Sequence, residues 1–120
     1  MSRDHRKLRV FELADELVGP IYRCTQVFPV EERYGLQAQI RRAAVSVPTN
    51  IVEGCARRST KDYLYFLGVA MGSASEVRYL LTLAGRLEFL PAAEGESLQQ
   101  RYDDLVRGLQ ALISSLAQGP

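Results

Sequence analysis

The sequence predicts an all-α protein, an antiparallel up-down-up-down, left-handed four-helix bundle with a kinked second helix. Three observations favour this fold: no stretch sustains the two-residue alternation of a strand, four segments repeat apolar residues at helical spacing, and short turns separate them. With 120 residues, the chain can bury about two thirds of its unfolded surface within one domain. Its composition, 47% hydrophobic and 24% charged, is that of an ordinary globular protein.

Caps and breakers bound the four expected helices. Apolar residues step by four and three from Val10 to Phe28, and Pro29 ends the first helix because proline disfavours a helical conformation in the residue before it. Ser59 is a suitable N-cap for the third helix, with Asp62 three residues later as in a capping box. The single domain, residues 1–120, therefore comprises a basic flexible tail at 1–7 and helices at about 8–28, 36–57, 60–89 and 94–117.

Pro48 lies in the middle of the second expected helix. It lacks the N–H that would bond the carbonyl of Ala44, so a kink is expected there, and the neighbouring Ser and Asn side chains can help to satisfy the freed backbone groups. Gly19 and Pro20 predict a similar kink or short break in the first helix.

A polar stripe runs along the second expected helix. Its members are Gln39, Ser46, Asn50 and Glu53. We interpret the stripe as a structural polar seam that fixes helix register or subunit contacts. The alternative is a phosphate-binding cleft formed with the flanking arginines.

Positive charge is concentrated in two places. The net charge of the chain is +1, yet residues 1–9 and 41–62 each carry +3. A neutral total argues against a dedicated, high-affinity nucleic-acid binder, whereas the local clusters allow a moderate electrostatic contact. The candidate nucleic-acid contacts are Arg41, Arg42, Arg57, Arg58 and Lys61. The alternative for these residues is a solvated face with peripheral salt bridges.

The third helix is apolar around more of its circumference than one core requires. The additional apolar residues are Leu64, Tyr65, Leu67, Val69, Met71, Tyr79 and Leu80, of which Leu64, Tyr65, Leu67, Met71 and Tyr79 are the candidates for an oligomer interface. A helix that is hydrophobic on two faces usually buries both, so a second copy of the chain is the expected partner. The alternative is a scatter of ordinary surface apolar residues.

The sequence offers little for catalysis. Cys24 and Cys55 are isolated thiols, and the only histidine, His5, lies in the basic tail, which excludes most zinc patterns and any Ser-His-Asp triad. Phosphate-cradling glycine loops and E-x-x-H metal motifs are absent from the sequence. We expect a non-enzyme without metal or cofactor. No apolar run approaches the ~18 residues of a membrane span, so we also expect a cytoplasmic location and no membrane partner.

Two stretches follow a recognisable pattern: FP-x-x-E-x-YGL-x-x-QIRRAAVS-x-P-x-NI-x-EG and, further on, FL-x-x-A-x-GS-x-x-E. They resemble the four-helix-bundle proteins named after open reading frames in 23S rRNA intervening sequences. The fourth helix matches only in length and pattern, and Pro20 departs from the uninterrupted first helix of that family.

This resemblance implies an up-down bundle that assembles into a ring of five subunits. A related group, the accessory proteins of diversity-generating retroelements, forms a similar basic pentamer that contacts nucleic acid and a reverse transcriptase. The family proper has no known biochemical role. If the binding role carries over, the matching positions are Arg41, Arg42, Arg57 and Arg58.

Two functional hypotheses follow. The first is a non-catalytic homo-oligomer, a homopentamer by resemblance, that acts as a scaffold with weak electrostatic binding of RNA or DNA. The second is a protein-protein interaction module that binds an unidentified protein and no nucleic acid.

Overall fold

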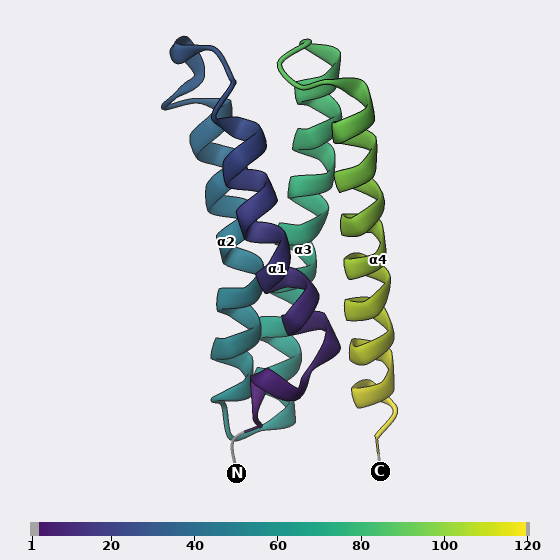
Figure 1. Cartoon of the computed structure of the whole chain (residues 1–120). Coiled ribbons are helices and arrows are strands. Elements are labelled where there is room, and N and C mark those ends of the chain that lie inside the picture. Colours follow the sequence, from purple (N-terminus) through teal and green to yellow (C-terminus); the bar gives the residue numbers. More distant parts are fainter. Residues whose placement is uncertain (1–2, 120) are drawn as a thin grey trace.

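Four long helices run side by side in the computed structural model, which describes residues 3–119 (Figure 1). The elements are a short 3-10 helix η1 (His5–Lys7), α1 (Arg9–Thr25), a second short 3-10 helix η2 (Val30–Glu32), α2 (Leu36–Cys55), α3 (Thr60–Arg86) and α4 (Ala92–Ala117). The bundle measures 49 × 23 × 19 Å, and the start of α1, the α2–α3 connection and the end of α4 lie at one end of it. The predicted all-α fold of four helices is confirmed. Its left-handed twist and the kink at Pro48 stay predictions.

The core follows the predicted apolar stripes. All six residues of the first predicted stripe are buried: five lie in α1, and Phe28 follows its end at Thr25. In α4 the buried stripe runs from Leu98 to Leu109. Helix α3 packs against both α2 and α4, while α1 packs mainly against α2. The third helix is therefore the one that must bury the widest face.

This position of α3 corrects part of the predicted interface. Leu67 is fully buried and Leu80 nearly so, and both belong to the core of the single chain. Leu67 is therefore not available to another copy. The predicted stripe was too narrow because a helix between two neighbours buries side chains on both flanks of its central line. Leu64 and Met71 are half-buried, whereas Tyr65 and Tyr79 remain 66% and 56% exposed.

The N-terminal residues are more ordered than the predicted flexible tail. Residues 5–7 form η1, and the Asp4 carboxylate accepts a hydrogen bond from the backbone N–H of Arg6 at 3.1 Å. The backbone N–H of Arg3 donates to the carbonyl of Cys55 at 2.8 Å. The segment from residue 3 is thus tied to the end of α2. The predicted residues 1 and 2 of the tail lie outside the described part of the chain.

Helix α2 continues past Pro48 without a break. The Thr49 hydroxyl donates to the carbonyl of Val45 at 2.7 Å, and the Asn50 amide donates to the carbonyl of Ser46 at 2.8 Å. Side chains thus bond two carbonyls close to the proline, with Thr49 contributing beside the expected Asn50. Helix α1 likewise runs through Pro20, so the alternative of a short break there is wrong.

The capping of α3 differs at its two ends. At the start, the Ser59 hydroxyl accepts a hydrogen bond from the N–H of Asp62 at 3.0 Å, as predicted for the N-cap. At the end, Phe89 N–H bonds the carbonyl of Ala84 at 2.9 Å and Glu88 N–H bonds that of Gly85 at 3.0 Å. These two bonds form a Schellman motif, which places Glu88 in the left-handed region with φ of 63°.

Glu88→Gly should stabilise the protein. A non-glycine residue in the left-handed region is strained, and glycine relieves this strain at the cost of greater freedom in the unfolded chain, so we expect a net gain of about 0.5–1 kcal/mol. Urea denaturation at fixed chain concentration measures the difference. Glu88→Ala is the matched control and should change stability by less than about 0.5 kcal/mol, since it keeps a Cβ at this position. Equal stabilities for the glycine and alanine variants would contradict the assignment of strain.

Candidate functional site

The five predicted basic contacts do not form one cluster within a chain. Arg41 and Arg42 lie in the first half of α2, whereas Arg57, Arg58 and Lys61 surround the α2–α3 connection. Arg42 and Arg57 are separated by about 22 Å of helix rise. The five residues therefore form two separate groups within a chain.

Arg41 has a structural role in holding α1 against α2. Its Nε donates to the Thr25 hydroxyl at 2.8 Å, its Nη2 donates to the carbonyl of Tyr22 at 3.0 Å, and its guanidinium lies 4.6 Å from the centre of the Tyr22 ring. A cation that bonds the last turn of a helix satisfies carbonyls without helical partners and interacts favourably with the helix dipole. The neighbouring Arg42 is exposed on the outer face of α2.

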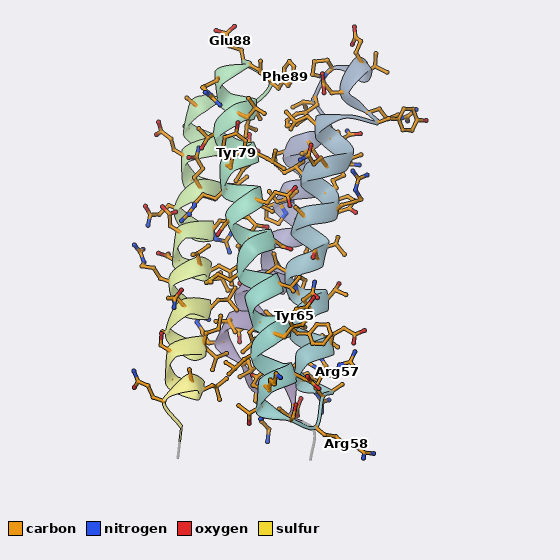
Figure 2. All side chains as sticks on the ribbon, turned by 180° about the vertical axis from the view of Figure 1, so that it is seen from behind. Arg57, Arg58, Tyr65, Tyr79, Glu88 and Phe89 are labelled. Atoms are coloured by element: carbon orange, nitrogen blue, oxygen red, sulfur yellow. The ribbon has the colours of Figure 1, made fainter. Side chains whose placement is uncertain are left out.

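A second group of basic residues gathers at the end of the bundle where α2 meets α3. Figure 2 shows Arg57 and Arg58 at this end. Arg57 pairs with Glu53 at 3.0 Å and lies over the Phe66 ring, while Arg58 and Lys61 are exposed. Isolated exposed ion pairs of this kind contribute ~0.5 kcal/mol to stability, so Arg57 can exchange its partner readily.

The N-terminal segment adds to this group. The Arg3 guanidinium lies 4.2 Å from the centre of the Tyr63 ring and reaches the Thr60 hydroxyl at 3.4 Å. We call this region the basic end. Its basic residues are Arg3, Arg6, Lys7, Arg57, Arg58 and Lys61, opposed by Asp4, Glu53 and Asp62. The two basic segments of the sequence thus meet in space, which no local pattern indicated.

The residues of the predicted polar seam make hydrogen bonds within their own chain. The Gln39 amide donates to the Glu76 carboxylate at 3.2 Å, and the Ser46 and Ser73 hydroxyls are 2.9 Å apart. Asn50 bonds Ser46 rather than α3, and Glu53 bonds Arg57. Two of the four predicted residues therefore reach from α2 to α3, and the other two make contacts within the α2 segment.

An open groove of about 760 Å³ lies along the outer face of α2. It is lined by Tyr22, Arg33, Tyr34, Gln37, Ala38, Arg41, Arg42, Val45, Ser46, Thr49 and Asn50. Three arginines and no carboxylate are among these residues, so the groove combines apolar and aromatic contact area with positive charge. The sequence predicted Arg41 and Arg42 as contacts but not Val45 of α2, Tyr22 of α1, or Arg33 and Tyr34 of the α1–α2 connection.

The two thiols are buried and protonated at neutral pH. Burial raises the pKa of the Cys24 thiol to about 11 and also raises that of Cys55. Burial likewise raises the pKa of the Tyr63 hydroxyl to about 12. Thiols of this kind are poor nucleophiles because the thiolate is the reactive form. Within residues 3–119 no group of three or more His, Cys, Asp or Glu residues is placed to hold a metal ion. No helix of this described part is both long and apolar enough to cross a membrane.

These features define an all-α four-helix-bundle protein with a basic end and an open, positively charged groove. The chain belongs to the family of 23S rRNA-intervening sequence proteins, whose family model matches residues 6–111. It is similar in structure to a protein of unknown function from the S23 ribosomal protein family of Bacteroides thetaiotaomicron. The TM-score is 0.81 and the sequence identity 24%, over 88% of this chain and 96% of the other. This likeness concerns the fold. A comparison with curated proteins finds no match.

Arg41→Ala should destabilise the fold. The substitution removes the donor that bonds both the buried Thr25 hydroxyl and the Tyr22 carbonyl and leaves only the bonds of that hydroxyl to the carbonyls of Ile21 and Tyr22. We expect a loss of about 1–3 kcal/mol. Arg58→Ala is the control, because this exposed side chain should change stability by less than about 0.5 kcal/mol. Urea denaturation at equal chain concentrations compares the two variants. Equal losses would contradict the structural role of Arg41.

The stability of the protein should fall at alkaline pH. Burial keeps the Cys24 thiol protonated up to a pKa of about 11 in the folded protein, against 9.0 for an ordinary thiol. The stabilisation from this group is therefore complete below pH 9 and is lost as the pH rises toward 11. Urea denaturation from pH 8 to 11 should show the decline, and Cys24→Ala should make it shallower by roughly 1–2 kcal/mol. An equal decline of stability with pH in Cys24→Ala and in the unsubstituted protein would contradict a raised pKa of the Cys24 thiol.

Proposed function

We propose that the protein is a non-catalytic, self-associating scaffold that binds RNA or DNA weakly by charge. The observation that carries the binding part of this proposal is the convergence of Arg3, Arg57, Arg58 and Lys61 at the basic end. Arg58 and Lys61 are exposed there, and the ion pair of Arg57 is weak enough to be exchanged for a phosphate.

Self-association raises the affinity with which weak individual contacts bind nucleic acid. The net charge of a single basic end is small, and a single copy is expected to bind nucleic acid only at low salt. Linking several such sites in one assembly makes the later contacts intramolecular and raises the total affinity by about 10²–10⁴. Support for association comes from the two exposed tyrosines of α3 and from the homopentamers that the family resemblance implies.

One observation favours the second candidate function, a protein-protein interaction module. Val27, Val30 and Tyr34 are 70%, 77% and 88% exposed around the α1–α2 connection, at the end of the bundle opposite the basic end. Large apolar side chains gathered on one surface often mark the contact site of another protein. This function predicts capture of a protein that survives nuclease treatment and is lost in a Val30→Glu/Tyr34→Glu variant.

Nucleic-acid binding should depend steeply on salt and on the basic end. With about four phosphate contacts per copy, the affinity for single- or double-stranded RNA should fall roughly 100-fold between 50 and 200 mM salt. Arg58→Glu/Lys61→Glu should abolish the mobility shift at 50 mM salt because it reverses two exposed charges at the basic end.

Arg23→Glu/Arg86→Glu is the matched control for this experiment. It changes the net charge of the chain equally but replaces exposed arginines at the opposite end of the bundle, so binding should persist. Binding that is insensitive to salt, no binding of RNA or DNA at 50 mM salt, or equal losses in both variants would contradict binding at the basic end.

A further inference from the structure

The outward face of α3 has the spacing of a helix-packing seam. Tyr65, Gly68, Gly72, Ser75 and Tyr79 follow one another at steps of three and four, the repeat with which helices pack in coiled coils. Figure 2 shows both tyrosines on α3. A Cβ added at Gly68 or Gly72 would meet no atom of this chain within 4 Å. The packing of a single chain therefore does not require glycine at these positions, although glycine disfavours a helix.

The outward face of α2 carries a second seam of the same spacing. It consists of Ala38, Arg42, Val45, Thr49 and Val52, at steps of four and three. Val45 and Val52 are 39% and 37% exposed, and the groove of about 760 Å³ lies over the first four residues of this seam. Apolar and small residues thus form a concave surface where a solvent-exposed helix would ordinarily be polar.

The contacts between α2 and α3 determine which residues of the two seams lie at the same height, that is, at the same position along the bundle axis. Gln39 bonds Glu76 and Ser46 lies against Ser73, so positions that ascend along α2 face positions that descend along α3. Continuing this antiparallel order with the helical rise per residue gives four pairs at equal height: Tyr79 with Ala38, Gly72 with Val45, Gly68 with Thr49 and Tyr65 with Val52. Tyr79 thus lies at the height of the small Ala38, and the two glycines lie at the heights of the β-branched Val45 and Thr49.

Charge is complementary at the same heights. Arg42 lies at the height of Ser75 and Glu76, and both Arg42 and Glu76 are exposed. Among residues 3–119 no carboxylate lies within ion-pair distance of Arg42. The Arg42 and Glu76 side chains also line one small hollow between α2 and α3 of their own chain, where Glu76 accepts a hydrogen bond from Gln39. A rotation about an axis parallel to the bundle keeps every residue at its height, so it brings Glu76 of one copy level with Arg42 of the next as well.

We propose that the α3 seam of one copy packs into the α2 groove of the next copy. The proposal rests on the self-association proposed above and names the two surfaces that make it. The contact joins two different faces, so it is heterologous, and a rotation that closes after a whole number of copies generates a ring. The glycines let the two helices approach closely, and Tyr79 enters the groove beside Ala38.

Substitution of a seam glycine tests the proposal. Gly72→Leu places a side chain between the two helices and should raise the dissociation constant of the assembly about 100-fold. Gly85→Leu is the matched control, because Gly85 also lies on α3 with open space around its Cα, but outside the seam, and should change the constant less than about threefold. Sedimentation velocity from 0.1 to 100 μM gives the constants, and circular dichroism confirms that both variants are helical. If Gly72→Leu does not fold, Gly72→Ala provides the same test with a smaller shift.

Charge exchange gives an independent test of the register. Arg42→Glu and Glu76→Arg should each weaken association about tenfold, and an equimolar mixture of the two variants should associate to within about threefold of the original protein, because opposite charges then meet only between copies. Assembly of Gly72→Leu with unchanged affinity, or failure of the mixture of charge variants to restore association, would overturn the proposed interface while leaving self-association intact. A single 13.4-kDa species of the unsubstituted protein at 100 μM would overturn self-association itself, and this interface with it.

Discussion

The close approach of α2 and α3 at Gly54 is the contact on which the rest of the structure depends. A Cβ at this position would lie 3.0 Å from the Cβ of Phe66 and 3.1 Å from the Tyr63 ring, so any other residue would push the end of α2 and the first turns of α3 apart by a few tenths of an ångström. Tyr63 is fully buried in consequence, and Arg3 stacks on its ring while bonding the carbonyl of Cys55. The same approach therefore sets the register of the helix pair and brings the N-terminal segment to the basic end.

The sequence predicts well what depends on local spacing. The six residues of the first predicted stripe are buried as predicted, and each observed long helix begins within two residues of its expected start. The sequence predicts less well where the burial of a residue depends on which helices pack against its own helix. Leu67 is buried because α3 is packed against α2 and α4, and no periodicity within one helix shows how many neighbours it has. Glu88 was not found because the left-handed end of a helix is usually signalled by glycine, which is absent at that position.

The basic residues show a similar limit of sequence reasoning. Arg41 and Arg42 are adjacent in the sequence, which predicts that they act together, yet they point about 100° apart around the helix. Arg41 bonds the last turn of α1, whereas Arg42 faces outward in the groove. Arg3 and Arg57 are far apart in sequence and yet lie at one end of the molecule. A cluster of like charges in sequence is therefore an unreliable guide to a cluster in space unless the contacts between helices are known.

The proposed interface and the proposed binding surface are compatible because they use different parts of the bundle. The two seams lie on the flanks of α2 and α3, whereas the basic end is formed by the chain segments at one end of the long axis. Copies related by a rotation axis parallel to that long axis bury one another's flanks and leave both ends of each bundle exposed. This rotation also keeps the same end of every copy on the same side, so all basic ends of such a ring share one face. An elongated polyanion can then contact several copies at once, which a contact made along the flanks would not permit.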